Sequence, residues 1–516
     1  MGGRRREALW LAGALVVAAL LRLHAIGRHG LWQDEIGSVL LAEDPGRVAD
    51  PLVGHGPLYF RALGLWLRGG HAEAWVRCLS VVTGLLVVVA AYAAARFTLG
   101  PRAAGAVAWL TGISPVQIWV SREARPYVLM DLLALLAFLA WARGRDTGRW
   151  RWWVGFGVAA AAALEAHYYA VFPLAAMGLW TVVELCSRWA PSPRRLVLGF
   201  LLGTGIALAL FAPQLRVALA GQRALGLYAS QVKAFATRRT FPAKTAGVLL
   251  ARSDPPHLLG GALEALASPR FTWVSALGLL ALLWLGARQA VRQRSVRALA
   301  PWIALAGGPV LLAVATNAWR DVFLDARYLT LTSVFLAAPA AVWAEGFTAR
   351  GRLVAAATAL GLSLAALQPL YRRPASEIRE ATGYIDAHSS HGDCVGVVAN
   401  KAFCYTYYSR APRPVFDLPW GLPSLSRKVD STLPLRERAV TARDIPAIAT
   451  YFARCRDTWI LYNEETMWGV DMGADILRRG LRDAGFHLLD RREFSDTRLE
   501  RYEPPIEGVR SGTEGP

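Results

Sequence analysis

Long apolar runs constrain this sequence more than any other feature. Segments of 16 to 22 residues with few charged side chains recur along it, close to the roughly 20 residues that a membrane-spanning helix needs. The chain is 54% hydrophobic with a mean hydropathy of +0.31, whereas soluble domains are about 45–50% apolar. We therefore predict a polytopic α-helical membrane protein with about eleven transmembrane helices. The predicted spans are 8–26, 74–95, 103–120, 127–142, 152–169, 170–187, 196–215, 272–287, 298–316, 328–345 and 353–370.

The formal net charge of +19 would indicate a nucleic-acid partner if the chain were soluble. Here many arginines lie in short loops between apolar runs, where positive charge marks the cytoplasmic side. They occupy the N-terminus and the loops 143–151, 187–195, 288–297 and 345–352, which all fall on one side of the predicted bundle. We expect membrane orientation, and no nucleic acid, to explain the charge. Only four of the 57 basic residues are lysines, a bias typical of GC-rich bacterial genomes, so we predict a multi-pass protein of the bacterial cytoplasmic (inner) membrane.

Five polar clusters fall on the opposite, extracytoplasmic side. They are "WQDE" (32–35), "HGPLY" (55–59), "SREARPY" (121–127), "EAHYY" (165–169) and "DARY" (325–328). Polar groups at the membrane edge are costly unless they face water, a partner or a ligand. We expect these clusters to line one cavity, between an external loop at 27–73 and a second one at 216–270. The second loop is basic, which suits an anionic ligand such as a lipid phosphate.

The C-terminal residues 371–516 follow a different pattern. Strand-like segments at 393–400, 413–418 and 457–463 alternate with helix-like segments at 376–388, 442–455 and 473–485. This alternation predicts a soluble α/β domain, and the odd number of preceding spans places it outside the cytoplasm. We interpret it as a lid or cap, not as a second active site. Cys394, Cys404 and Cys455 would then allow one disulfide and leave one thiol, and the sequence does not choose the pair.

The ordered set of polar clusters resembles the GT-C superfamily of membrane glycosyltransferases, in particular the protein O-mannosyltransferases and the bacterial aminoarabinose–lipid A transferases. Members carry an Asp-Glu motif in the first external loop, here Asp34 and Glu35, followed in many by His-Pro-Pro-Leu-Tyr, here "HGPLY". Gly56 replaces the first proline, so we expect a looser turn. "SREARPYVLM", "HYY" and "ARY" also have counterparts. The resemblance covers roughly 1–370 and implies a transmembrane catalytic domain, a polyprenyl-phosphate sugar as donor and transfer on the outer face.

We assign the catalytic base to Asp34, because the acceptor must lose a proton as it attacks the sugar, and a carboxylate can take it. Glu35 is expected to orient a neighbour or contact the acceptor. The alternative is that both acids cap the helix that starts there, whose N-terminal dipole favours negative charge. The resemblance favours catalysis for Asp34.

The departing phosphate needs fixed cations, and arginine offers a planar fork suited to its oxygens. Arg125 and Arg327 are the first candidates, and Arg122 and Lys233 are weaker ones. The alternatives are ion pairs of Arg125 with Glu123 and of Arg327 with Asp325. The predicted substrate-binding residues are His55, Tyr59, Glu123, Arg125, Tyr127, His167, Tyr168, Lys233, Arg327 and Tyr328.

No fixed metal-ligand spacing is present, so no cofactor is predicted with certainty. The alternative is a divalent metal held by His55 or His167 with Glu123 or Glu165. Asp131 lies deeper in a predicted span, so the predicted site does not include it.

We predict an inverting glycosyltransferase that moves a sugar from a polyprenyl-phosphate donor, such as an undecaprenyl phosphate sugar, to a protein, glycolipid or polysaccharide. One alternative is an oligosaccharide ligase or an enzyme like an oligosaccharyltransferase, using a pyrophosphate-linked glycan. Another is a transporter or non-catalytic binder of lipid-linked sugars. A transporter would show paired repeats or interrupted helices near the membrane centre, and we find no clear repeat.

Overall fold

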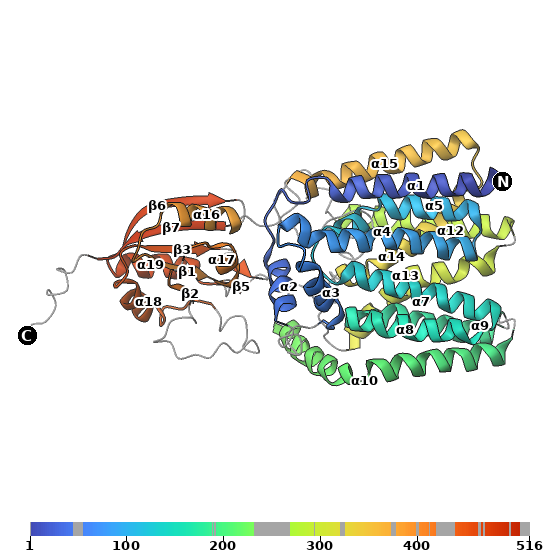
Figure 1. The fold of residues 1–516 in the computed structure, drawn as a ribbon, viewed down its shortest axis with the longest axis horizontal. Helices are drawn as coiled ribbons and strands as arrows, with labels where there is room; N and C mark the ends of the chain where they lie inside the picture. The colour runs from blue at the N-terminus through green and yellow to red at the C-terminus, as the bar shows by residue number, and fades with distance from the viewer. Residues whose placement is uncertain are drawn as a thin grey trace, which may run out of the picture. The chain divides into compact units, whose positions relative to one another are not determined.

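The computed structural model describes two units, each presented by itself (Figure 1). The first holds Met1–Gly27 and most of the chain from Ser38 to Arg373, and the second holds Arg28–Gly37 with the chain from Pro374 on. The described residues are 2–44, 55–187, 189, 192–231, 269–293, 295–319, 326–372, 378–398, 402–411, 413–418, 439–462, 466–467, 470–494 and 497–505.

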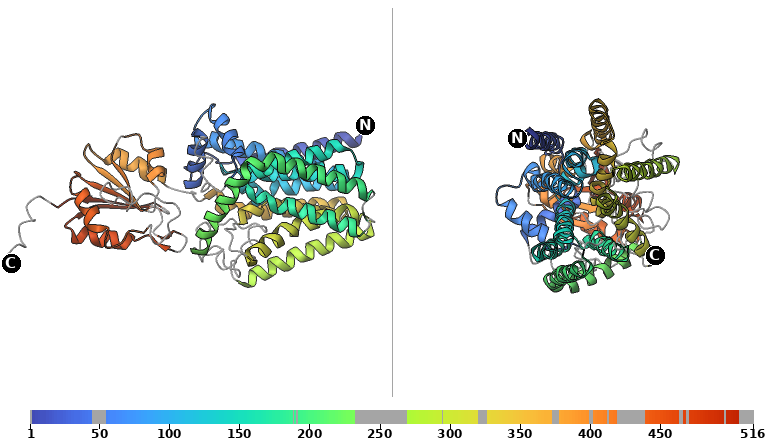
Figure 2. Two further views of the ribbon diagram at one scale, coloured as in Figure 1. Left: turned by 90° about the horizontal axis from the view of Figure 1, so that it is seen from below. Right: turned by 90° about the vertical axis from the view of Figure 1, so that its right-hand side faces the viewer.

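The first unit is a bundle of helices, seen from two further sides in Figure 2. Each of the eleven predicted segments is largely helical, although some of them, such as 103–120 and 152–169, are interrupted. Within the described residues, six helices are long and apolar enough to cross a membrane, or seven if one bent pair counts as a span; the number of spans remains a prediction. The helices are α1 (Gly2–Leu23), α2 (Gln33–Glu43), α3 (Leu58–Leu67), α4 (Glu73–Thr98), α5 (Pro101–Ile113), α6 (Pro115–Ser121), α7 (Tyr127–Thr147), α8 (Trp150–Ala166), η3 (Tyr168–Ala170), α9 (Val171–Cys186), α10 (Pro193–Gln231), α12 (Pro269–Arg292), α13 (Val296–Trp319), η6 (Ala326–Leu329), α14 (Leu331–Ala344) and α15 (Ala349–Arg372).

The bent pair is α5 and α6, which the sequence pattern had indicated as one continuous span, 103–120. The axes of the two helices differ by 57°. The break falls at Ser114–Pro115, because a residue before proline avoids the helical conformation. Ser114 then caps α6, accepting the N–H of Gln117 at 3.5 Å, and Pro115 occupies the first turn, where its missing N–H does no harm.

The break leaves main-chain carbonyls of α5 inside the bundle, and two other helices supply donors to them. Arg22 of α1, which is fully buried, donates to the carbonyl of Gly112 at 2.8 Å. The hydroxyl of Ser363 in α15 donates to the carbonyl of Ile113. Polar contacts therefore tie α1 and α15 to the end of α5.

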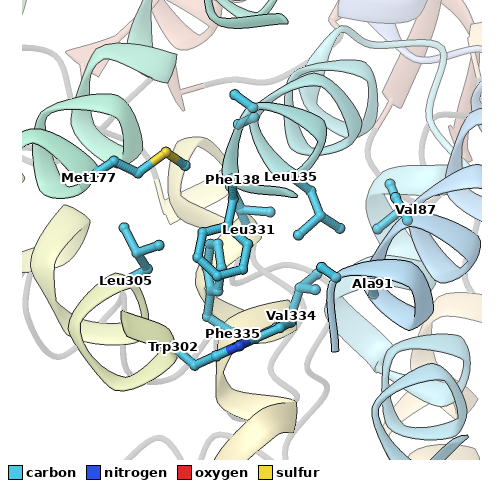
Figure 3. Packing of buried hydrophobic residues seen from close by; sticks show 14 of the residues in the cluster. Val87, Ala91, Leu135, Phe138, Met177, Trp302, Leu305, Leu331, Val334 and Phe335 are labelled. Atoms are coloured by element: carbon cyan, nitrogen blue, oxygen red, sulfur yellow. The ribbon is translucent and has the colours of Figure 1, made fainter. Parts of the chain in front are cut away.

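Aromatic side chains fill the core between α7, α13 and α14 (Figure 3). Phe138 meets Trp302 and Phe335 edge-to-face, with ring centroids 5.1 Å apart in both pairs. Such edge-to-face packing is the favoured geometry of aromatic pairs. It fixes the helix that carries Asp131 against the helix that follows Arg327.

The second unit confirms the predicted α/β domain. Its five-stranded sheet has the order β2-β1-β3-β7-β6; β1 runs parallel to β2 and β3, and β7 is antiparallel to β3 and β6. A disulfide joins Cys394 to Cys455, while Cys404 is a buried thiol. The strands are β1 (Cys394–Val398), β2 (Val415–Leu418), β3 (Thr458–Tyr462), β4 (Thr466–Met467), β5 (Val470–Asp471), β6 (His487–Phe494) and β7 (Thr497–Glu503), and the helices are α16 (Ile378–His388), α17 (Ala402–Tyr408), α18 (Ile445–Phe452) and α19 (Ala474–Asp483).

Candidate active site

Arg125 lies at the centre of a buried polar cluster in the first unit. Its guanidinium donates to Ser38 Oγ at 3.2 Å, to His55 Nε2 at 2.8 Å and to Tyr127 Oη at 3.4 Å. The side chain is 8% exposed. Three elements thus fix the fork of Arg125: α2, the turn before α3, and the start of α7.

The turn at "HGPLY" is packed closely, so the expectation of a looser turn was wrong. A Cβ atom on Gly56 would lie 2.0 Å from the carbonyl oxygen of Glu165, a main-chain atom that cannot move aside. Only glycine lets the two backbones approach in this way. The approach brings the ring of His55 to 4.6 Å from the ring of His167, measured between centroids.

His167 takes its place because α8 ends one residue before it. Its backbone is extended, with φ −159° and ψ 127°, and its Nδ1 accepts the N–H of Tyr169 at 3.2 Å. The imidazole therefore caps η3 while remaining buried. The ring of Tyr127 lies 5.6 Å from that of His167, so two of the predicted clusters, 121–127 and 165–169, meet here.

The contact with Arg125 defines the protonation of His55. A guanidinium has donors only, so Nε2 must accept and the neutral ring carries its proton on Nδ1. Burial, followed by the charge of Arg125 and by His167, lowers the pKa of His55 well below its usual value. His55 Nδ1 is buried and meets no hydrogen-bond partner in the described part of the chain. His55 is a neutral support for the arginine.

Trp119, in α6, contacts two further predicted residues. The guanidinium of Arg327, in η6, lies over the ring of Trp119 at 5.7 Å, within the range of a cation–π contact. The indole N–H of Trp119 donates to Glu123 Oε1 at 2.7 Å. One tryptophan thus links the predicted phosphate ligand Arg327 to the predicted carboxylate Glu123.

Asp34 and Glu35 lie in the first turn of α2 and belong to the second unit. Glu35 is buried and accepts the main-chain N–H of Trp32 at 3.2 Å. Trp32 directly precedes α2, so this contact is the acidic half of a capping box. Asp34 is half-buried. The contact favours a capping and orienting role for Glu35 and leaves the role of Asp34 as base a prediction.

The segment before α2 is anchored within the second unit. The N–H of Leu31 donates to the hydroxyl of Tyr408, in α17, at 2.5 Å. Arg379, in α16, donates to the carbonyl of Arg28 at 2.9 Å. The α/β domain therefore holds the chain just before the Asp-Glu motif.

The other predicted residues are distributed as follows. Tyr59, in α3, is buried with its hydroxyl 3.4 Å from Ser80 Oγ. Tyr168 packs instead against Phe211 of α10, with ring centroids 6.0 Å apart, in a separate apolar cluster. Lys233 and Asp325 lie outside the described residues, as does the side chain of Tyr328.

Arg122 serves the end of a helix. Its Nη1 donates to the carbonyls of Arg22 and His24 at 2.7 and 2.6 Å, which is a favourable use of a cation at a helix C-terminus. No three His, Cys, Asp or Glu side chains among the described residues come together to hold a metal ion.

Sequence reasoning missed four polar side chains around these arginines. Ser38 holds Arg125, while Gln117, Asp131 and Thr330 form a hydrogen-bonded group beneath η6. Asp131 and Gln117 offered one signal, since each is a strongly polar residue within a predicted span. Ser38 and Thr330 offered none, because hydroxyl side chains are common near helix ends.

Comparisons with known proteins bear on this geometry. Residues 54–216 match the family model of dolichyl-phosphate-mannose-protein mannosyltransferase. No curated protein matches the chain. The apo crystal structure of ArnT from Cupriavidus metallidurans has a TM-score of 0.61 at 13% identity, covering 97% of this chain and 98% of that chain. The oligosaccharyltransferase of Archaeoglobus fulgidus with a tethered acceptor peptide has a TM-score of 0.50 at 12% identity, covering 88% and 69%.

The family match includes His55, Arg125 and His167, the residues at the centre of the buried cluster. The likeness to ArnT extends over nearly the full length of both chains, the α/β domain included. The chain therefore shares the fold of ArnT, and its residues 54–216 resemble the dolichyl-phosphate-mannose-protein mannosyltransferase family.

Proposed function

We propose that the protein is an inverting glycosyltransferase that takes a sugar from a polyprenyl-phosphate carrier and delivers it to an acceptor on the extracytoplasmic face of the membrane. The matching family is described by a donor of this chemical class, dolichyl phosphate mannose. The observation that carries the proposal is the fixed guanidinium of Arg125, held by Ser38, His55 and Tyr127. A positioned arginine fork is well suited to phosphate oxygens.

The proposed reaction is one in-line displacement at the anomeric carbon. The acceptor oxygen or nitrogen forms a bond to that carbon as its proton passes to the carboxylate of Asp34. The bond from the anomeric carbon to the phosphate oxygen breaks, and its electron pair stays on the phosphate. Polyprenyl phosphate leaves, and one displacement inverts the configuration. A single base suffices, since no covalent intermediate forms.

The two arginines would act on the phosphate as its negative charge grows. Donors fixed before the reaction stabilise developing charge without reorganising. Arg125 is fixed by hydrogen bonds and Arg327 by the ring of Trp119. Ser38 and Asp34 are four residues apart in α2, and residues with this spacing share one face of a helix. This spacing supports a role for Asp34 on the face of α2 that also carries Ser38.

The disulfide supports the extracytoplasmic orientation of the second unit. Bonds such as Cys394–Cys455 persist in oxidising compartments and are rare in the cytoplasm. This agrees with the arginine-rich loops, which assign the other side of the membrane to the cytoplasm. A reporter fused after Pro516 should therefore be active only outside the cytoplasm; cytoplasmic activity would contradict the orientation.

Asp34→Asn tests the proposed function most directly. The amide keeps nearly the shape of the carboxylate but cannot take the acceptor's proton, so turnover should fall by about two or more orders of magnitude while donor lipid still binds. Purified variants would be assayed with labelled polyprenyl-phosphate sugar and an envelope extract as acceptor.

Glu35→Gln is the matched control. Glutamine can still accept the N–H of Trp32, so we expect a milder loss. If Asp34 only caps α2, Asp34→Asn should transfer sugar at nearly the wild-type rate, because asparagine caps helices about as well as aspartate. That result would rule out the assignment of the base.

A further inference from the structure

We propose that Asp131, with Gln117 and Thr330, is a positioning group for Arg327: it fixes the segment η6 so that the guanidinium meets the donor phosphate. The inference rests on the proposed function and extends it to residues that no substrate atom needs to touch. All three side chains are fully buried.

The carboxylate of Asp131 reaches the start of α14 from the side of α7. Its Oδ2 accepts from Thr330 Oγ1 at 2.8 Å and from Gln117 Nε2 at 2.9 Å. Thr330 is the residue directly before α14. Through the hydrogen bond to Thr330, Asp131 secures the junction between η6 and α14.

Gln117 closes the group from the side of α6. Its Nε2 also lies 3.1 Å from the carbonyl oxygen of Thr330 and 3.3 Å from Ser333 Oγ. Gln117 and Trp119 are two residues apart on the short helix that begins at the Ser114–Pro115 break. The same helix therefore holds the main chain after Arg327, through Gln117, and the guanidinium of Arg327, through Trp119.

Thr330 is connected to Arg327 by only three residues of main chain. Thr330 Oγ1 lies 3.3 Å from the carbonyl oxygen of Arg327, three residues earlier. η6 is a single turn of four residues, Ala326–Leu329, so it has little rigidity of its own. Fixing Thr330 from two helices defines where this turn, and the arginine on it, must lie.

The energetic cost of burying Asp131 indicates that its side chain has a specific role. An ionisable group inside an apolar bundle is expensive, and the carboxyl group of Asp131 is fully buried. An apolar side chain would fill this space at lower cost. In some proteins a buried polar group fixes one geometry where apolar packing allows several, and the proposed role of Asp131 is of this kind.

Thr330→Val tests the inference, because valine keeps the shape of threonine and removes only the hydroxyl. We expect kcat/KM for the polyprenyl-phosphate donor to fall about ten- to hundredfold, since small misplacements of a positioned group have effects of this size. Thr330→Ser restores the hydroxyl and should restore most of the activity.

Thr332→Val is the matched control. Thr332 lies two residues further on in α14, is equally buried, and its hydroxyl meets no hydrogen-bond partner within the described chain. We expect transfer close to wild-type. A general sensitivity of this helix to the loss of a hydroxyl would instead impair both valine variants and overturn the inference.

A double-mutant cycle separates positioning from stability. If Thr330 acts through Arg327, Thr330→Val should lower transfer by no more than about twofold in an Arg327→Ala background, because interacting sites are not additive. Additive losses, or normal transfer by Thr330→Val alone, would overturn the inference.

Hydrogen exchange keeps the inference distinct from the proposed function. Thr330→Val should speed amide exchange across 326–330, and Thr332→Val should not. If Arg327→Ala transfers normally, the phosphate role of Arg327 fails, while the exchange data still decide whether Asp131 and Thr330 hold the segment. Unchanged exchange in Thr330→Val would overturn the positioning itself.

Discussion

The two ends of the helical unit use their arginines differently. At the end formed by the start of α1 and the ends of α4 and α7, arginines pair with carboxylates: Arg145 with Glu184 at 2.9 Å, and Arg96 with Glu7 at 2.8 Å. At the opposite end, the hydrogen bonds described for Arg125 go to a hydroxyl, an imidazole and a phenol.

The difference lies in what the arginine contacts do: some join helices through ion pairs, and others fix the direction of one guanidinium. An ion pair between an arginine and a carboxylate neutralises both groups and fixes two helices together. The contacts of Arg125 with a hydroxyl, an imidazole and a phenol fix the direction of its guanidinium fork. The first arrangement suits the packing of helices, and the second suits a site for an anion, as the proposed function requires.

The largest expected effect is the contrast between Arg125→Ala and Arg145→Ala. Loss of a preorganised donor to a developing anion reduces turnover by about 10²- to 10³-fold, so Arg125→Ala should be nearly inactive while remaining folded. Arg145→Ala should keep its turnover per folded molecule and lower the thermal midpoint. Activity and thermal unfolding in detergent measure both.

Arg125→Lys sharpens the same contrast. Lysine brings a point charge without the fork, so we expect little recovery of transfer. Normal transfer by Arg125→Ala would contradict the proposed functional difference between the arginines at the two ends of the helical unit.

The next effect concerns two glycines in close contacts. Alanine at Gly56 would place Cβ 2.0 Å from a main-chain oxygen, and alanine at Gly144, in α7 near the ion-paired end, would place it 2.7 Å from the ring of Trp153. Both variants should be less stable. Only Gly56→Ala should also lose about tenfold or more in turnover per folded molecule, because the shift moves His55 away from Arg125. Equal specific activities in the two variants would contradict this.

A smaller effect separates two glutamates that share one kind of contact, a hydrogen bond from a tryptophan. Glu184 and Glu123 each accept an indole N–H from the tryptophan four residues earlier, Trp180 at 2.9 Å and Trp119 at 2.7 Å. Glu184→Gln weakens the pair with Arg145 and should lower the free energy of unfolding by about 1–3 kcal/mol. Glu123→Gln should lower kcat several-fold with little change in stability. The reverse pattern would show that the two ends are not specialised.

The smallest effect is the pH dependence carried by His55. Its pKa is below the ordinary 6.5, so below pH 6.5 the unfolded chain binds the extra proton first. The stabilisation from neutral His55 is therefore fully present above pH 6.5 and decreases as the pH falls towards the folded pKa, by at most about 1.4 kcal/mol per pH unit. Thermal midpoints at pH 7.5 and 5.5 should differ more in the wild type than in His55→Gln. His71→Gln, at an exposed histidine beside Glu43, should behave as the wild type does.

Hydropathy predicted the helices well, because a membrane span needs about 20 apolar residues and therefore appears in the sequence as a long apolar run. It did not predict the break at Ser114–Pro115, since both neighbouring stretches are apolar and only the dipeptide marks the bend. In the α/β domain, β6 and β7 were missed for a different reason. "HLLDRREF" and "TRLERYE" carry so many charges that no alternating pattern stands out, and Glu500 is buried beside Arg478 and Tyr502.

The sequence brought His55, Arg125, Tyr127 and His167 into one predicted site, and the structure places them in contact. Gly56 was misread because sequence shows that a side chain is absent but not what approaches it. Asp131 was set aside because its depth in a span says nothing about Thr330, which lies 199 residues later. Contacts at that separation depend on how helices pack, which local patterns do not record.

Arg22 has a consequence for the way the protein is made. Its acceptor, the carbonyl of Gly112, lies 90 residues further along the chain, so the first helix leaves the ribosome before its partner exists. At typical translation rates the delay is on the order of 5 to 20 s. Throughout that interval a guanidinium destined for the bundle interior must stay near the membrane surface or inside the insertion machinery. Helix α1 is therefore synthesised first but can reach its final position only after α5 has been inserted.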